Sequence, residues 1–244
     1  MANGFMPYNG PSEIDGKPIK GIITGTNNPS LNVKTSDMLQ LFIMPTSSKP
    51  SDAIRNGDDS SVCGDCAHRP ILVAAAKAAA KTQAEKDAVV ATCYVEVGKS
   101  VNAVYGATYP EHGESKRRPP VRFGAWGEPT AVPFDIIAGY TSDGHTGYTH
   151  RWKAKNGVPA CDQRFKLLLM ASVDSAEEYA EASAMGWRCF RVRKANEPIL
   201  PNEIMCPASK EGGLKTTCNR CLLCAGTSKT AKDITIIEHG KGIK

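Results

Sequence analysis

Four cysteines gather within 19 residues near the C-terminal end of the chain: Cys206, Cys218, Cys221 and Cys224. The last three have the spacing C-x2-C-x2-C, which lets successive sulfur atoms converge on one centre. Thiolates at such spacing are typical of iron–sulfur clusters and of tetrahedral zinc sites. Because zinc usually takes two separated C-x2-C pairs, the triple repeat favours a cluster of the [4Fe–4S] type. We therefore predict an iron–sulfur centre at these residues, with zinc as the alternative.

A second group of cysteines, Cys63, Cys66 and Cys93, has the spacing C-x2-C-x26-C. It begins in a loop that follows an apolar run at residues 38–44, which we expect to be a buried strand. In parallel α/β architectures the loops at the carboxyl ends of strands build the site. We predict a second metal site here, with structural thiols as the alternative. Three thiolates leave one coordination position open, or filled by His68, Cys161 or a ligand.

Cysteine content also indicates the compartment of this 244-residue chain. Clustered thiols in a reducing compartment more often bind metal than form disulfides, and nine cysteines cannot all pair. The N-terminal residues do not resemble a targeting segment, and no stretch approaches the 18 apolar residues of a spanning helix. These features predict a soluble cytoplasmic protein without a membrane partner. The net charge of +5 is too small to indicate nucleic acid by itself.

Secondary-structure signals alternate along most of the chain. Residues 1–33 are rich in Gly, Pro, Asn and Ser, so we expect a flexible arm with one short strand at 21–24, followed by a single domain at 34–244. Further strands are expected at 93–97, 121–124, 148–150, 165–171, 188–193, 204–206 and 234–237, and helices at 71–91, 133–140 and 176–185. Strand–helix–strand order predicts an α/β fold, specifically a partial (β/α) barrel with parallel strands and a cysteine-rich C-terminal loop.

Candidate ligand-binding side chains follow two of these strands. Gly127 and Glu128 lie in a glycine-rich turn, where the carboxylate of Glu128 could hold a ligand amine or a ribose hydroxyl, or be a solvated turn residue. His150, beside Arg151, is a second candidate catalytic residue with Glu128, although an ordinary strand edge explains it as well. Arg191 and Arg193 share one face of a strand and are candidates for binding an anionic cofactor, or for ordinary ion pairs.

Two resemblances extend this interpretation. Residues 61–69, 93–95, 147–152, 170–174, 186–188 and 206–224 resemble a family of uncharacterised bacteriophage proteins, over most of residues 38–240. That resemblance implies a viral origin, and hence the host cytoplasm, but no activity.

The layout is also loosely similar to that of radical S-adenosylmethionine enzymes. Those are partial (β/α) barrels with a three-cysteine cluster loop after the first strand, a Gly-Gly-Glu-Pro-like turn after the second and often a C-terminal cluster. The matching places are Cys63, Cys66 and Cys93, the turn Gly127-Glu128-Pro129, and the four C-terminal cysteines. The first loop departs from the family, whose spacing is C-x3-C-x2-C.

Three hypotheses follow from the sequence. The first is an iron–sulfur protein, and, if it is an enzyme, a radical S-adenosylmethionine-like or redox enzyme acting on a small molecule. The second is a zinc-stapled protein that binds nucleic acid through basic clusters, Trp126 and Trp152. The third is a phage interaction protein with one structural metal and no catalysis. Neither catalysis nor the oligomeric state follows from the sequence.

Overall fold

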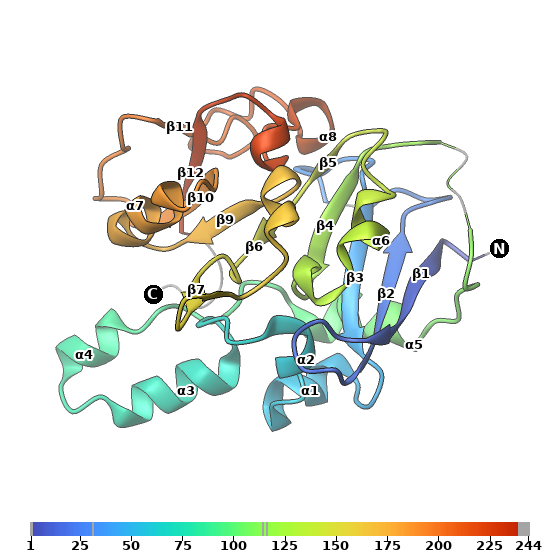
Figure 1. The fold of residues 1–244 in the computed structure, drawn as a ribbon, viewed down its shortest axis with the longest axis horizontal. Helices are drawn as coiled ribbons and strands as arrows, with labels where there is room; N and C mark the ends of the chain where they lie inside the picture. Colours follow the sequence, from blue (N-terminus) through green and yellow to red (C-terminus); the bar gives the residue numbers. More distant parts are fainter. Residues whose placement is uncertain (1, 31, 114, 116, 239–244) are drawn as a thin grey trace.

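The computed structural model describes residues 2–30, 32–113, 115 and 117–238, which form a mixed α/β structure (Figure 1). The strands are β1 Gly4–Pro11, β2 Pro18–Thr24, β3 Leu39–Pro45, β4 Val121–Trp126, β5 His145–Thr146, β6 Tyr148–Thr149, β7 Ala154–Lys155, β8 Val158–Pro159, β9 Met170–Val173, β10 Cys189–Arg193, β11 Glu203–Met205 and β12 Asp233–Ile237. The helices are α1 Pro50–Asn56, α2 Ser60–Cys63, α3 Pro70–Ala79, α4 Gln83–Ala88, α5 Asn102–Gly106, α6 Phe134–Ala138, α7 Ala176–Ala184 and α8 Cys218–Cys221. Short 3-10 turns lie at Pro129–Ala131, Gln163–Leu167 and Gly226–Ser228, and a π-helical turn at Val97–Val101.

Two five-stranded sheets carry the parallel strands that the sequence predicts. One has the order β1-β2-β3-β4-β5, in which β3, β4 and β5 are parallel, and the other has the order β11-β12-β10-β9-β6, in which all pairs are parallel. Only Gly147 separates β5 from β6. A Cβ atom there would lie 2.5 Å from Leu169 Cδ2, so the close approach of the two sheets requires glycine.

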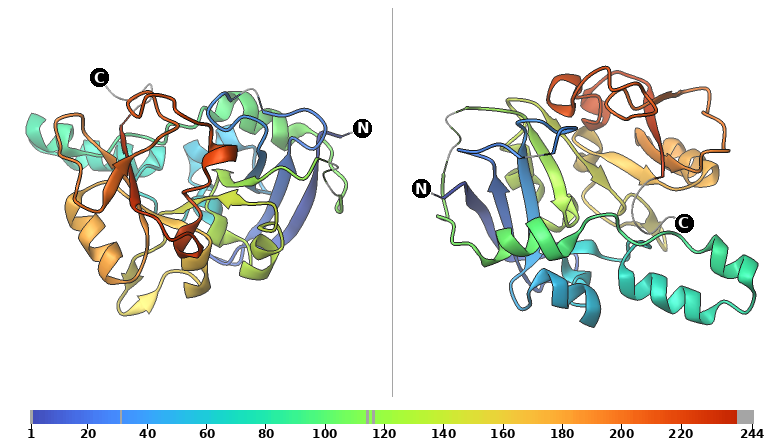
Figure 2. Two further views of the ribbon diagram at one scale, coloured as in Figure 1. Left: turned by 90° about the horizontal axis from the view of Figure 1, so that it is seen from above. Right: turned by 180° about the vertical axis from the view of Figure 1, so that it is seen from behind.

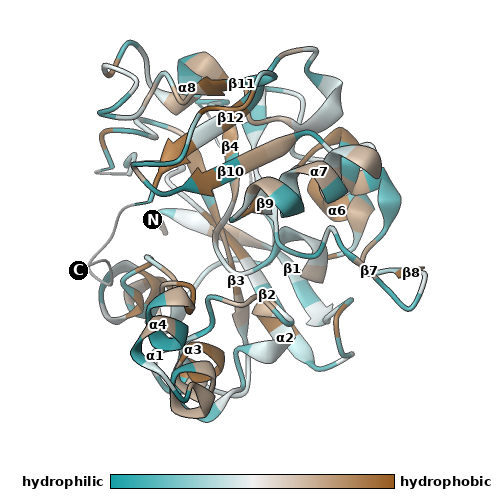
Figure 3. Cartoon of the chain, turned by 90° about the vertical axis from the view of Figure 1, so that its left-hand side faces the viewer, coloured by the Kyte–Doolittle hydropathy of each residue, from teal (hydrophilic) through white to brown (hydrophobic). Residues whose placement is uncertain are grey.

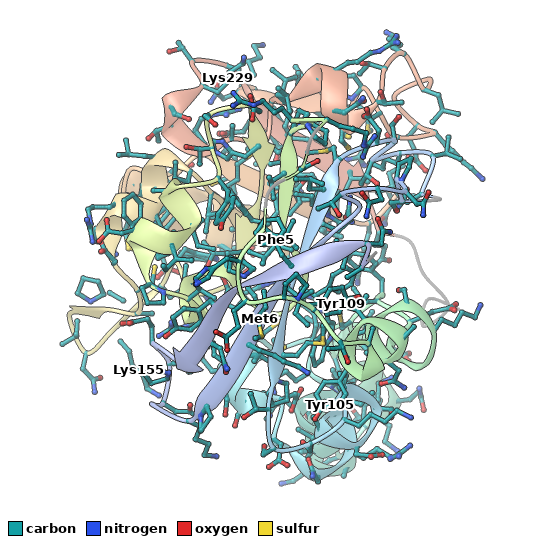
Figure 4. The ribbon with its side chains drawn as sticks, turned by 90° about the vertical axis from the view of Figure 1, so that its right-hand side faces the viewer. Phe5, Met6, Tyr105, Tyr109, Lys155 and Lys229 are labelled. Carbon is teal, nitrogen blue, oxygen red and sulfur yellow. The ribbon has the colours of Figure 1, made fainter. Side chains whose placement is uncertain are left out.

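The N-terminal region is more ordered than the sequence suggested. Strands β1 and β2 form an antiparallel hairpin, and β2 pairs antiparallel with β3 over six residue pairs. The prediction of a flexible arm at residues 1–33 is therefore wrong for residues 4–24. Ile19, Ile22 and Ile23 pack into the main core, and this burial outweighs the many turn-forming residues around them. On this side of the molecule, Phe5, Met6 and Tyr109 lie close together (Figure 4).

Three other expected elements differ from the structure. The helix expected at 71–91 is divided, because Ala80 is extended and Thr82 starts α4 with a capping box to Glu85. Residues 93–96 are not a strand. The strand expected at 165–171 begins only at Met170, after a 3-10 turn. The helix expected at 176–185 is confirmed as α7, with Ser175 as its N-cap.

The apolar residues form two clusters. The larger one lies around the first sheet and includes Ile43, Phe123 and Trp126. The smaller one contains Met170, Phe190 and Ile234 from the second sheet together with Cys206 and Cys224. In Figure 3, α7 carries both hydrophobic and hydrophilic residues.

The helices α3 and α4 project away from both sheets as a hairpin (Figures 1 and 2). Their exposed surface includes Ile71 and Leu72, each 37% exposed. Among the described residues, no helix is both long enough and apolar enough to cross a membrane.

Candidate functional site

Four parallel strands end at one region of the molecule, and each is followed by a polar or thiol side chain. After β3 the chain runs through α1 and α2 to Cys63, after β4 it reaches Glu128, after β6 His150, and after β9 Asp174. Because carboxyl ends of neighbouring parallel strands meet at one edge, these groups come together although they are far apart in sequence. We call Cys63, Cys66 and Cys93 the first cysteine set.

The three thiols of the first cysteine set lie close enough together to affect one another's pKa. Burial raises the pKa of Cys63 well above its ordinary value, and Asp59, Cys66, Cys93 and Glu128 raise it further. Burial likewise raises the pKa of Cys66 to about 12. The turn that joins Cys63 to Cys66 is closed by the Cys66 N–H, which donates to the Cys63 carbonyl at 3.2 Å.

The structure explains how Cys93 comes close to Cys63 and Cys66, although 26 residues separate it from Cys66. The backbone N–H of Cys93 donates to the carbonyl of His68 at 2.8 Å. The Nδ1 atom of the same histidine lies 2.7 Å from the Ala91 carbonyl oxygen. The segment between them, which carries α3 and α4, therefore leaves and returns at one place. Its two ends meet beside Cys66, so the 26 intervening residues do not displace the third thiol.

His68 joins this hairpin to the end of β9. Its Nε2 atom lies 2.8 Å from Asp174 Oδ2, so both ring nitrogens face oxygen acceptors, as the doubly protonated ring requires. Burial lowers the pKa of His68, but its bond to Asp174 outweighs burial and the pKa is raised. Both nitrogens are engaged, which leaves neither free as a fourth metal ligand. The N-cap of α7 is Ser175, so the carboxylate of Asp174 is not used as the cap and bonds His68 instead.

Glu128 and His150, the candidate catalytic residues, lie next to each other. The backbone N–H of His150 donates to Glu128 Oε2 at 3.0 Å, and the N–H of Glu128 donates to the Val62 carbonyl at 2.6 Å. Only 5% of Glu128 is exposed. Gly127 has φ +84°, and a Cβ atom there would lie 2.4 Å from the Ile43 carbonyl oxygen, so the turn requires glycine.

The imidazole of His150 lies close to that of His68, with ring centroids 5.4 Å apart. Burial lowers the pKa of His150, and nearby Glu128 only partly opposes this. Cys161 also lies near this region, since burial raises its pKa to about 12 and Glu128 adds to the rise. Of the two protein candidates for the fourth position, His68 already has both ring nitrogens engaged.

The second cysteine set consists of Cys206, Cys218, Cys221 and Cys224. All four line one pocket together with Thr146, Tyr148, Pro207, Ala208, Leu222, Leu223 and Ile234. The cavity that these residues enclose is small, about 10 Å³, and it is partly open to solvent. Residues from both ends of a 19-residue segment thus surround one space, as the spacing predicted.

Local geometry brings these four thiols to the pocket. Cys218 and Cys221 begin and end the single turn of α8, which places both on one face. Leu222 has φ 49° and reverses the chain toward Cys224. The N–H of Cys206 donates to the Thr235 carbonyl of β12 at 2.9 Å, and the N–H of Gly147 donates to the Cys224 carbonyl at 2.9 Å. The set is therefore tied to the strands of the second sheet.

The remaining predicted residues are engaged elsewhere. Arg191 is buried, and its guanidinium donates to both oxygens of Glu203 at 2.7 and 2.8 Å. Arg193 donates to the Glu197 carbonyl at 2.6 Å. Neither arginine touches a cysteine of either set in the contacts of the described residues. Trp126 and Trp152 are each only 3% exposed.

Within the described ranges, no three His, Cys, Asp or Glu side chains are grouped so as to hold a single metal ion.

No family model, no curated protein and no solved structure matches the chain. The assignment of the two cysteine sets therefore depends on their own geometry.

Proposed function

We propose that this chain is an iron–sulfur protein with two centres, one at each cysteine set. The observation that carries the proposal is the single pocket lined by Cys206, Cys218, Cys221 and Cys224. A cubane cluster has a separate iron atom for each thiolate, so it needs four cysteines around one space and not four sulfurs in contact with one ion. A zinc ion would need all four sulfurs about 2.3 Å from its centre.

The first cysteine set suits a different kind of centre. Three thiolates would hold three corners of a cluster and leave one iron without a cysteine. The buried carboxylate of Glu128 and the imidazole of His150 lie beside the set, where they can contact and orient a small molecule. An iron–sulfur centre supplies one-electron chemistry, and an open iron also supplies a binding position. We infer a redox or radical S-adenosylmethionine-like role for this site, with Gly127 and Glu128 in its ligand-binding turn.

The order of the strands supports the partial (β/α) barrel that this function requires. Strands β3, β4 and β5 are followed, across Gly147, by β6, β9 and β10, and within each sheet these strands are parallel to their neighbours. The residues proposed for chemistry follow the carboxyl ends of these strands, where (β/α) barrels carry their active sites.

A nucleic-acid-binding role has less support. Bases stack on accessible aromatic side chains, whereas the indoles of Trp126 and Trp152 are buried. The Trp152 Nε1–H donates to the Ser172 carbonyl at 2.8 Å, which fixes this ring in the core. Zinc at the second cysteine set remains an alternative to iron, and the experiment below separates the two.

Metal analysis after anaerobic purification tests the proposal. We expect a brown protein that contains iron and acid-labile sulfide in equal amounts, with little zinc. A colourless protein with stoichiometric zinc and no sulfide would show that the cysteines bind zinc. Protein purified under the same conditions with neither metal would contradict both assignments.

A further inference from the structure

A row of polar side chains crosses three neighbouring strands between the two cysteine sets. In the register of the first sheet, Gln40 of β3 is opposite Arg122 of β4, and Arg122 is opposite Thr146 of β5. Directly paired residues lie on the same face of a sheet, with strands about 4.8 Å apart. Thr146 also lines the pocket of the second cysteine set, so Arg122 lies at the edge of that pocket.

Arg122 lies near one member of each cysteine set. Its Nη2 atom donates to the hydroxyl of Tyr94 at 3.0 Å, and Tyr94 directly follows Cys93 of the first set. On the other side, Tyr148 and Cys218 lie near enough to act on its charge. Burial lowers the pKa of Arg122, but Tyr94, Tyr148 and Cys218 outweigh it, so the guanidinium stays charged. The residue is only half-buried, which leaves part of its surface accessible.

Arg122 lacks the partners that other interior arginines of this protein have. Buried Arg193 donates to the backbone carbonyls of Lys194, Ala195 and Glu197. Arg69 pairs with Asp59 at 2.6 Å, and Arg191 pairs with Glu203 at 2.7 Å. In the part of the chain that the structure describes, Arg122 forms no ion pair with Asp or Glu. A half-buried cation that has lost part of its contact with water and lacks a carboxylate partner gains from an anion supplied from outside the chain.

We propose that Arg122 binds the carboxylate of a small molecule that lies between the two cysteine sets. A guanidinium can donate two parallel hydrogen bonds to a carboxylate, which fixes both the position and the orientation of the ligand. Beside it, the ring of Tyr148 packs on Phe190 with centroids 4.3 Å apart and provides an apolar surface for the rest of the molecule. The inference does not depend on which metal the cysteine sets bind.

Arg122 could instead only balance the negative charge of the cysteine sulfurs, since it acts on both Cys93 and Cys218. The two roles respond differently to substitution. Lysine keeps the charge but cannot form the paired hydrogen bonds of a guanidinium. A charge-balancing residue is therefore replaced adequately by Arg122→Lys, whereas a carboxylate-binding residue is not.

Binding of matched probes tests the proposal. The purified holoprotein is titrated by calorimetry with acetate, phenylacetate and 4-phenylbutyrate, and with the corresponding amides, which have the same shape without the charge. We expect at least one carboxylate to bind, and its amide to bind at least about tenfold more weakly, as the loss of charged hydrogen bonds implies. Arg122→Gln and Arg122→Lys should each weaken that carboxylate by about tenfold or more.

Arg55→Gln is the matched control, because Arg55 is an exposed arginine on α1 that pairs with Asp52. This variant should bind the carboxylate as the wild type does. The proposal is overturned if none of the carboxylates binds, if the amides bind equally well, or if Arg122→Gln binds unchanged. Inorganic phosphate that binds as tightly as the carboxylate, and loses its binding in Arg122→Gln, would overturn the assignment to carboxylates.

Discussion

The two cysteine sets use the same kind of side chain in opposite surroundings. Around Cys63, Cys66 and Cys93 lie charged and titratable groups, which are Asp59, His68, Glu128, His150 and Asp174. The second set belongs to an apolar cluster with Met170, Phe190, Leu223 and Ile234. Carboxylates and imidazoles therefore accompany the set that lacks a fourth cysteine, whereas the charged groups that act on Cys218 include the cations Lys34 and Arg122. Under the proposed function, the first set would act on a ligand and the second would stabilise the fold or pass electrons.

The two sets also differ in how they are attached. The second is hydrogen-bonded to the strands, through Cys206 to β12 and through Cys224 to the residue between β5 and β6. The first lies on α2 and on the base of the α3–α4 hairpin, outside the sheets. In the view of Figure 1, α8 lies at the upper edge of the molecule and α2 toward the lower edge. Loss of the second set should therefore harm stability more.

The largest effect is expected from removing all four thiols of the second set. Metal binding at a closed site contributes directly to folding, so the C206S/C218S/C221S/C224S variant should lose several kcal/mol of unfolding free energy, a large part of the roughly 5–15 kcal/mol of a typical domain. The C63S/C66S/C93S variant should lose much less. Anaerobic thermal unfolding of both variants measures the difference, and equal losses would remove the proposed distinction.

A second prediction concerns the strand that precedes Cys206. Glu203 begins β11 and is the buried partner of Arg191, so Glu203→Ala leaves this buried guanidinium with only the partly exposed Glu197 as a carboxylate partner. We expect a loss of about 3–5 kcal/mol in chemical denaturation. Asp52→Ala removes the exposed partner of Arg55 and should cost only about 0–1 kcal/mol. Similar losses in the two variants would show that the buried pair does not hold β11 in place.

A third prediction tests whether the bonds of His68 hold together the two ends of the α3–α4 hairpin, and with them Cys93 beside Cys66. His68→Ala removes the ring bonds to Ala91 and Asp174, which we expect to cost about 1–3 kcal/mol and to loosen the base of the hairpin. Limited proteolysis should then cut faster between α3 and α4 than in the wild type. His112→Ala, at an exposed histidine, serves as the control. Unchanged proteolysis in His68→Ala would mean that another contact holds the ends of the hairpin together.

The smallest effect is a pH dependence at the junction between the sheets. His145 is buried in β5, and burial lowers its pKa below the ordinary value, while its bond to the Leu168 carbonyl opposes this only in part. A lowered folded-state pKa means that its contribution to stability is present above the ordinary histidine pKa and is lost as the pH falls through it. Wild-type stability should therefore decrease more between pH 7 and pH 5 than that of His145→Gln. Parallel pH profiles would contradict this assignment.

Local patterns in the sequence predicted the second cysteine set well, because α8 and its flanking turns bring those residues together over a short distance. The gathering of Glu128 and His150 was predicted only in part, since it depends on the parallel order of β4 and β6. The role of Asp174 could not be predicted from its neighbours, because its partner His68 is 106 residues away. Its position directly after a buried strand was the one available signal.

Tertiary contacts also explain the two clearest differences from prediction. The turn-rich composition of the N-terminal region suggested an arm, but pairing with the buried strand β3 makes β1 and β2 part of a sheet. The spacing of Cys93 does not match that of a known cluster loop. In the structure, the α3–α4 hairpin returns the chain to His68 just before Cys93. Sequence spacing measures distance along the chain, and a hairpin whose ends are hydrogen-bonded makes that distance irrelevant.

The most direct test of the two-centre account is the iron and acid-labile sulfide content of three proteins prepared anaerobically in parallel: the wild type, C63S/C66S/C93S and C206S/C218S/C221S/C224S. With a [4Fe–4S] cluster at each set, the wild type should hold about eight iron atoms and each variant about four. C161S and C189S, which change cysteines outside both sets, should match the wild type unless Cys161 is the fourth ligand. Unchanged iron in either multiple variant, or wild-type protein without iron, would contradict the account.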